Sequence, residues 1–221
     1  MLPFDVKSHR RFEEPLTLLP RILTKLYSMW LSTTYPFASK GSHLSIHFTS
    51  DFYRPKAHRI KLGSSVTISK DTWFNVTVAP EEIGEPMIII DDDCCIGPRC
   101  WISAKNCIHL EHDVMVAPSV LIMDHSHSYE DIALPIRDQG ATEGGRIRIM
   151  QGCWIGQGAA IVCSRGELVL GRNCVVAANS LVSRSFPANS VIAGNPARVV
   201  KQFDPEKRAW VMRVSRRPDR Q

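Results

Sequence analysis

The feature that most constrains the fold is a six-residue repeat of aliphatic side chains, which extends with interruptions from Ile60 almost to Lys201. A small or polar residue such as Gly97 often follows the aliphatic one, and a second small residue often lies four places after it. A period of six fits neither an α-helix nor an amphipathic strand. It fits a triangular coil in which three short strands and three tight turns make one lap, with the aliphatic side chains stacked inside. The repeated aliphatic positions are Ile90, Ile96, Ile102, Ile108, Val114, Val120, Ile149, Ile155, Ile161, Leu170, Val176 and Val182.

The longest interruption of this repeat is the segment 124–148, which reads DHSHSYEDIALPIRDQGATEGGRIR. A coil filled by its own side chains leaves little room for an internal site, so we expect function where the repeat is interrupted. A long loop inside a compact domain is usually functional or disordered. The two histidines and several carboxylates of this loop favour a functional one.

Composition narrows the class of protein. The chain has 221 residues, 44% of them apolar, which is enough for one sizeable domain with extensions. The formal charge of +5 comes largely from the two ends. It is interpreted either as solvated tails or as attraction to an anionic surface, polymer or cofactor. No basic stripe with interleaved aromatic residues is present, so a nucleic-acid partner is not expected.

Seven cysteines are present, and four of them (Cys94, Cys100, Cys153 and Cys174) occupy the same small position of the repeat. We interpret them as core residues in a reducing compartment, which favours a cytoplasmic location. No CxxC pair supports a zinc site.

The repeat divides the chain into three parts. Residues 1–59 are predicted to be an N-terminal extension, residues 60–203 the coil, and residues 204–221 a charged tail with a short helix. Within the extension, Leu19, Ile22, Leu23, Leu26 and Trp30 recur at helical spacing. This amphipathic helix is expected to pack on the coil or on a neighbouring subunit. Because Arg21 and Lys25 flank this apolar stripe, the alternative that the helix lies on the inner face of a membrane stays open.

Several segments together resemble the hexapeptide-repeat acyltransferases: the six-residue array, the DHSHSYED loop, CWIGQGAAIV and SVIAGNPARVV. The resemblance is to the sugar and polysaccharide O-acetyltransferases, which are related to galactoside and maltose acetyltransferases. It implies an all-β fold, a left-handed parallel β-helix with an N-terminal helical extension and an inserted active-site loop. It also implies a homotrimer, acetyl-CoA as co-substrate, no metal, and a sugar or polysaccharide acceptor in cell-surface biosynthesis.

Acetyl transfer to a hydroxyl needs a base, and a neutral histidine titrates near working pH. The resemblance assigns this role to His127, which lies in the lap after the segment Ala117–Val120, with His125 as the second choice. A carboxylate is expected to orient the base by accepting a hydrogen bond from its other ring nitrogen. The candidates, among which the sequence does not choose, are Asp124, Glu130, Asp131 and Glu143.

The resemblance also implies residues that contact the cofactor. These are a tryptophan at the acetyl-CoA tunnel, a backbone position at the pantetheine arm, and residues near the nucleotide phosphates. They correspond to Trp154, Gln157, Ala178, Ser183, Arg184 and Arg198. Without the resemblance, the two arginines would be interpreted as solvated surface charges.

Two departures from the family pattern leave alternatives open. The segment 97–105 lacks the acid that holds the sugar in galactoside acetyltransferases. The identity of the acceptor therefore cannot be carried over from that family, and a nucleotide-sugar amine or a drug is an alternative acceptor. In addition, His109 and His112 lie outside the loop. With His125 or His127 they could bind zinc between subunits, as in γ-type carbonic anhydrases. A non-catalytic β-helix scaffold is the third hypothesis.

Overall fold

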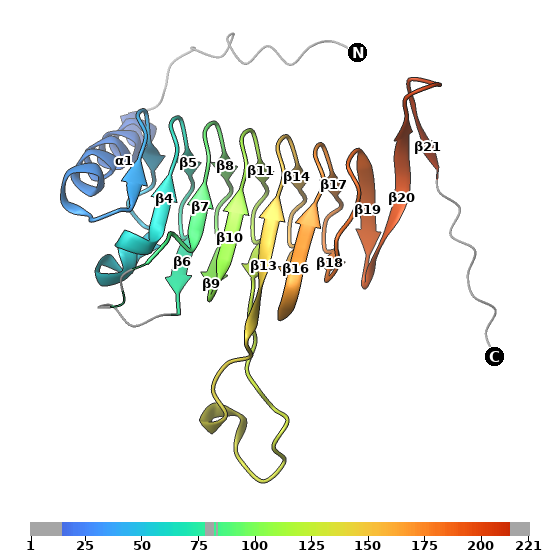
Figure 1. Ribbon diagram of the computed structural model, residues 1–221. Helices are drawn as coiled ribbons and strands as arrows, with labels where there is room; N and C mark the ends of the chain where they lie inside the picture. The colour runs from blue at the N-terminus through green and yellow to red at the C-terminus, as the bar shows by residue number, and fades with distance from the viewer. Residues whose placement is uncertain (1–14, 78–81, 83, 213–221) are drawn as a thin grey trace.

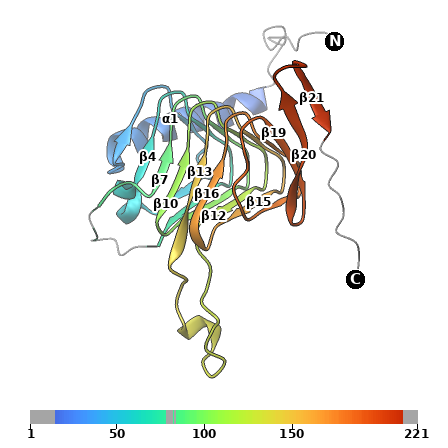
Figure 2. The same cartoon turned by 45° about the vertical axis from the view of Figure 1, so that its right-hand side comes forward.

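The computed structural model describes residues 15–77, 82 and 84–212, and shows a left-handed parallel β-helix preceded by one α-helix (Figure 1). Three parallel sheets form the faces of the coil, and each lap contributes one short strand to each sheet. Figure 2 shows the laps stacked one behind another, with the described C-terminal strands at the far end of the coil from α1. The fold expected from the repeat is therefore confirmed.

The first sheet contains β1 (Ser39–Lys40), β4 (Ile60–Leu62), β7 (Ile88–Ile90), β10 (Cys107–Leu110), β13 (Gly144–Ile149) and β16 (Arg165–Leu170). The second contains β2 (Ser45–Ile46), β5 (Thr67–Ile68), β8 (Cys95–Ile96), β11 (Met115–Val116), β14 (Trp154–Ile155), β17 (Val175–Val176), β19 (Ser190–Gly194), β20 (Ala197–Asp204) and β21 (Ala209–Met212). The third contains β3 (Asp51–Phe52), β6 (Trp73–Val76), β9 (Trp101–Ala104), β12 (Leu121–Met123), β15 (Ala160–Val162) and β18 (Leu181–Val182). The helices are α1 (Pro15–Thr34) and the short 3₁₀ helices η1 (Arg54–Arg59) and η2 (Ile136–Asp138).

The repeated aliphatic side chains fill the coil. Ile96 in β8 lies in register with Ile68 in β5 and Val116 in β11, and all three are buried. Every aliphatic position of the repeat named above is at most 1% exposed. Because successive laps place like residues over one another, each lap extends a single apolar column, and this burial is the main stabilising contribution of the fold.

The small positions of the repeat lie at the turns. Cys94, Cys100, Cys153 and Cys174 are free thiols within the buried core. The Sγ atom of Cys94 lies 3.0 Å from the carbonyl oxygen of Glu111, and the other three also donate to backbone carbonyl oxygens. Burial raises the pKa of the Cys94 thiol to about 12, so this group stays protonated near neutral pH. Their interpretation as core residues is confirmed.

Close stacking of laps explains the glycine that follows the aliphatic position. A Cβ atom on Gly97 would lie 2.7 Å from the carbonyl carbon of Ala117 in the next lap. A Cβ atom on Gly156 would lie 2.6 Å from the carbonyl oxygen of Val176. Both distances are too short for any other residue type without movement of the backbone.

The structure corrects the boundaries expected from the repeat. Strands β1, β2 and β3 pair with β4, β5 and β6, so a complete lap precedes residue 60 inside the segment expected to be an irregular extension. The short helix expected in the tail is wrong. Residues Ala209–Met212 form β21, which pairs antiparallel with β20 and closes the second sheet with a hairpin.

The N-terminal helix is present, but it contacts the coil through a face different from the one expected. Tyr27, Ser28 and Leu31 face β2, and the Oγ atom of Ser28 accepts a hydrogen bond from the backbone N of Ile46 at 2.8 Å. The five apolar residues of the predicted stripe are exposed, so their packing on the coil of the same chain is wrong. Among the described residues, no helix combines the length and the apolar content needed to cross a bilayer.

Candidate active site

The candidate site lies where the chain leaves β12 in the third sheet and returns to β13 in the first. The loop between these strands projects away from the coil in both views (Figures 1 and 2). It starts at Asp124, whose side chain is fully buried. The carboxylate accepts hydrogen bonds from the backbone N atoms of Lys105, Asn106 and Cys107 at 2.7, 2.8 and 2.9 Å. It therefore joins the start of the loop to the turn between β9 and β10.

The two histidines of the loop have different environments. The Nδ1 atom of His125 lies 3.0 Å from Oδ1 of Asp124, and the His125 side chain is 12% exposed. His127 is exposed, and its backbone forms an isolated antiparallel bridge with Ala141. Among the four carboxylates left open by the sequence, Asp124 is thus the one that contacts a histidine ring of the loop. His125 is held by Asp124 at the edge of the coil, whereas His127 is exposed.

The base of the loop is closed by contacts between its two ends. Ser126 and Thr142 exchange two hydrogen bonds, from Ser126 N to Thr142 Oγ1 at 3.0 Å and from Thr142 N to Ser126 O at 2.8 Å. The Nζ atom of Lys105 donates to the carbonyl oxygen of Thr142, and Nδ2 of Asn106 donates to that of Glu143 at 3.0 Å. These contacts fix the backbone on both sides of His127. Sequence reasoning missed Lys105 and Asn106, which carry no periodic signal.

A polar cavity of about 490 Å³ lies at this closed base. Its lining combines hydroxyl groups, two carboxylates and a guanidinium, which are the groups that bind sugar hydroxyls in water-accessible sites. The lining residues are Ser126, Ser128, Tyr129, Glu130, Ala141, Thr142, Glu143, Ser164 and Arg165. Ser126 and Ser128 flank His127, so the cavity lies beside the candidate base.

The tip of the loop is ordered by its own polar contacts but exposes apolar side chains. Gln139 accepts a hydrogen bond from the backbone N of Asp131 and donates to the carbonyl oxygens of Asp131 and Leu134. Ile132, Leu134 and Ile136 are exposed, and Ile132 is completely so. An apolar tip held in one shape is suited to contact another molecule.

The residues expected to contact the cofactor lie at two different corners of the coil. Gln157 and Ala178 lie in successive laps at the corner between the second and third sheets, where Asn179 N donates to Gln157 O at 2.8 Å. Arg198 in β20 pairs antiparallel with Ala193 in β19, in the lap that follows Ala178. Trp154 begins the strand before this corner and is 46% exposed.

Ser183 and Arg184 instead follow β18, at the corner from which the loop that begins at Asp124 also leaves. The guanidinium of Arg184 lies 5.2 Å from the centroid of the Phe186 ring. Trp154 and Arg198 lie in strands, and the other four residues lie in the connections between strands. One chain thus carries two candidate cofactor surfaces separated by the third sheet, so no single groove of the chain contains all six residues.

The two histidines of the zinc alternative are not brought together with a loop histidine. The Nε2 atom of His109 lies 2.7 Å from Oδ2 of Asp91, and His112 is exposed at a turn. In the part of the chain that the structure describes, no group of three or more His, Cys, Asp or Glu side chains is arranged to hold a metal ion.

Comparisons with known proteins concern the fold and the class of enzyme. No model of a protein family matches the chain. A protein of Escherichia coli (strain K12) named as the lipopolysaccharide biosynthesis O-acetyl transferase WbbJ is 26% identical over 157 residues, or 68% of this chain and 79% of that protein. A protein of Mycobacterium tuberculosis (strain ATCC 25618 / H37Rv) named as an acetyltransferase is 34% identical over 111 residues, 48% of this chain and 36% of its own length.

The crystal structure of AntD, an N-acyltransferase from Bacillus cereus in complex with dTDP and 3-hydroxybutyryl-CoA, superposes with a TM-score of 0.66. The match covers 81% of this chain and 90% of that chain, at 16% sequence identity. These relatives and the shared fold support the resemblance of this chain to the hexapeptide-repeat acyltransferases. At this identity, the likeness to AntD concerns the fold of this acyltransferase and not its acceptor.

Proposed function

We propose that this acyltransferase transfers an acetyl group from acetyl-CoA to a hydroxyl of a sugar, in the synthesis of a cell-surface polysaccharide or glycolipid. The observation that carries the proposal is an exposed histidine, His127, held at the closed base of a loop that interrupts the β-helix beside a polar cavity. WbbJ is named for the same reaction class and for lipopolysaccharide biosynthesis, and supports this choice of acceptor.

The chemistry requires a base for the acceptor hydroxyl. In this proposal, a ring nitrogen of His127 takes the hydroxyl proton as the oxygen attacks the thioester carbonyl carbon. The carbon–sulfur bond then breaks, and the thiol of CoA leaves with a proton. The exposure of His127 allows an acceptor to reach it. The Asp124–His125 pair is bonded to the coil on one side and adjoins Ser126 on the other, and it positions the loop segment that carries His127.

The active enzyme is proposed to be a homotrimer with each site shared between two subunits. Two observations support it: the candidate cofactor surfaces of one chain lie at separate corners, and the apolar loop tip extends beyond its own coil. A ring closed by three-fold rotation brings unlike surfaces of neighbouring chains together. The loop of one subunit would then reach the row of Gln157, Ala178 and Arg198 on the next.

Release of CoA thiol measured against a panel of acceptors tests the proposal. The panel contains free sugars, lipid-linked sugars and a nucleotide amino sugar, each with acetyl-CoA. Turnover with a sugar that lacks an amine supports O-acetylation. Turnover confined to the amino sugar would replace it by N-acetylation, and no turnover with any member would contradict the proposed function. Light scattering under the assay conditions measures the assembly, and an active monomer would contradict the shared site.

A further inference from the structure

One face of α1 is left largely uncovered by the residues that the structure describes, apart from ring contacts of Trp30 with Tyr27 and Tyr35. Seven large apolar side chains on this helix are between 39% and 61% exposed. They are Leu18, Leu19, Ile22, Leu23, Leu26, Met29 and Trp30. Scattered exposed apolar residues are ordinary, but a contiguous apolar surface marks a site of contact with a protein or a membrane.

Helical geometry places these residues on a single face. Successive residues turn by about 100° around the helix axis. Thr24, Tyr27, Ser28 and Leu31 form the stripe that faces β2, and the seven exposed residues occupy the opposite side. The apolar face of α1 therefore points away from the coil while the opposite stripe of the helix stays packed on β2.

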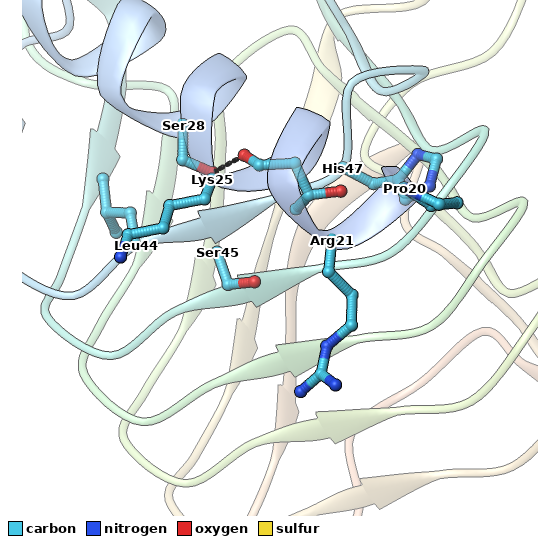
Figure 3. Close-up of a pocket in the computed structure, with 8 residues that line it drawn as sticks. Pro20, Arg21, Lys25, Ser28, Leu44, Ser45 and His47 are labelled. Carbon is cyan, nitrogen blue, oxygen red and sulfur yellow. Dashed lines mark hydrogen bonds between the residues drawn. The ribbon is translucent and has the colours of Figure 1, made fainter. Parts of the chain in front are cut away.

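Basic side chains border this apolar face. Arg21 and Lys25 lie between the apolar face and the coil-facing stripe, and the segment Pro15–Thr34 contains no acidic residue. A pocket of about 380 Å³ opens between α1 and β2 on the same side (Figure 3), and its lining includes Arg21, Lys25 and His47. In Figure 3 the Arg21 side chain extends from the helix over the strands below.

We infer that α1 docks this protein on an anionic lipid membrane. The apolar face enters the boundary between headgroups and acyl chains, and Lys25 reaches the lipid phosphates along its border. An apolar face with a basic border and no acid is the combination that binds such surfaces, because apolar burial and attraction to anionic headgroups add.

Charge favours a lipid surface over a second copy of the helix. If two copies of α1 packed on each other through the apolar face, the cations that border both faces would lie close together, and like charges oppose such a contact. Anionic phosphates instead neutralise them. The inference goes beyond the proposed acetyl transfer and does not depend on it, since a docked scaffold would show the same binding.

Co-sedimentation with lipid vesicles tests the inference on the full chain. Vesicles of phosphatidylcholine alone are compared with vesicles that also contain about 30% phosphatidylglycerol. We expect binding to the anionic vesicles that falls as salt rises. The double substitution Ile22→Gln/Leu26→Gln is expected to weaken this binding at least about tenfold, and Lys25→Glu about threefold.

Matched controls lie at the opposite end of the coil. Met212→Gln removes an exposed apolar side chain from β21, and Arg208→Glu makes the same charge change as Lys25→Glu in the neighbouring turn. Both are expected to bind vesicles like the wild type. Quenching of tryptophan fluorescence by brominated lipid, lost on Trp30→Phe, locates the contact at α1 independently of affinity.

Two results would overturn the inference. One is binding that does not distinguish anionic from neutral vesicles and does not change in the helix variants. The other is a smaller assembly of Ile22→Gln/Leu26→Gln by light scattering with circular dichroism unchanged, which would show that another subunit covers this face. Neither result bears on thiol release with a soluble sugar, so failure of the inference is distinguishable from failure of the proposed function.

Discussion

The buried carboxylate of Asp124 is expected to be the residue on which the geometry of the candidate site depends most. Oδ1 accepts hydrogen bonds from Lys105 N and His125 Nδ1, and Oδ2 accepts from Asn106 N and Cys107 N. In Asp124→Asn one oxygen becomes an amide NH₂ group. Turned one way, the amide NH₂ group faces the backbone N–H groups of Asn106 and Cys107; turned the other way, it faces that of Lys105 and the ring nitrogen of His125, so at least one backbone donor loses its acceptor.

The magnitude follows from these contacts. A hydrogen bond to a charged group contributes about 1.5–3 kcal/mol, and a buried donor left unpaired costs a similar amount. The loss of one or two of these contacts predicts a loss of about 2 kcal/mol or more in the free energy of unfolding of Asp124→Asn. Because the substitution also releases the loop segment that carries His127, turnover is expected to fall by about a hundred-fold.

Urea unfolding at one fixed protein concentration measures the stability, and thiol release measures the turnover. Asp131→Asn is the matched control, because this exposed carboxylate of the same loop accepts a single backbone hydrogen bond, from Ala133. The control is expected to lose less than about 1 kcal/mol. Equal stability of the two variants would refute the reasoning that Asp124 anchors the loop.

Three further expectations concern the base, the cofactor and an ion pair. His127→Ala should lose at least about a hundred-fold in turnover with acetyl-CoA affinity unchanged; normal turnover here with an inactive His125→Ala would move the base to His125. Arg198→Glu should raise KM for acetyl-CoA, and the increase should shrink with added salt because exposed charges are screened; an unchanged KM at low salt would return Arg198 to plain surface charge. Although burial opposes ionisation of Glu111, hydrogen bonds from the backbone N of Gln151 and from Arg148 hold the pKa of its carboxyl below the usual range. The stability advantage of wild type over Glu111→Gln should therefore be full above the ordinary carboxyl pKa of about 4.3, and it should be lost as pH falls from there through the lower pKa of the folded state. Urea titrations at several pH values would check this.

The sequence is most informative where structure repeats locally. The aliphatic column could be predicted because each lap buries Ile or Val at the same place, as Ile96 and Ile102 do. The first lap was missed because β1, Ser39–Lys40, has no buried residue, and only Ile46 and Phe52 mark the next two strands as inward-facing. The closing hairpin was missed because its pairing depends on contacts across the turn rather than on the repeat.

The candidate site depends on contacts that are distant along the chain. The loop and its histidines could be located by the interruption of the repeat. The choice of Asp124 among the carboxylates could not, because its partners Lys105, Asn106 and Cys107 lie 17 to 19 residues earlier. The exposure of Leu19, Ile22 and Trp30 could not be predicted from the sequence either. A helical stripe indicates that one face of a helix is apolar, but it does not indicate what covers that face.

We propose that a loop histidine of this acyltransferase drives acetyl transfer to a sugar hydroxyl. Mass spectrometry and NMR of the product formed from acetyl-CoA and the best acceptor of the panel test this proposal. We expect one acetyl ester on a sugar oxygen, formed by the wild type and reduced at least about a hundred-fold in His127→Ala/His125→Ala. An acetylated amine, or an ester formed equally well by the double variant, would contradict it.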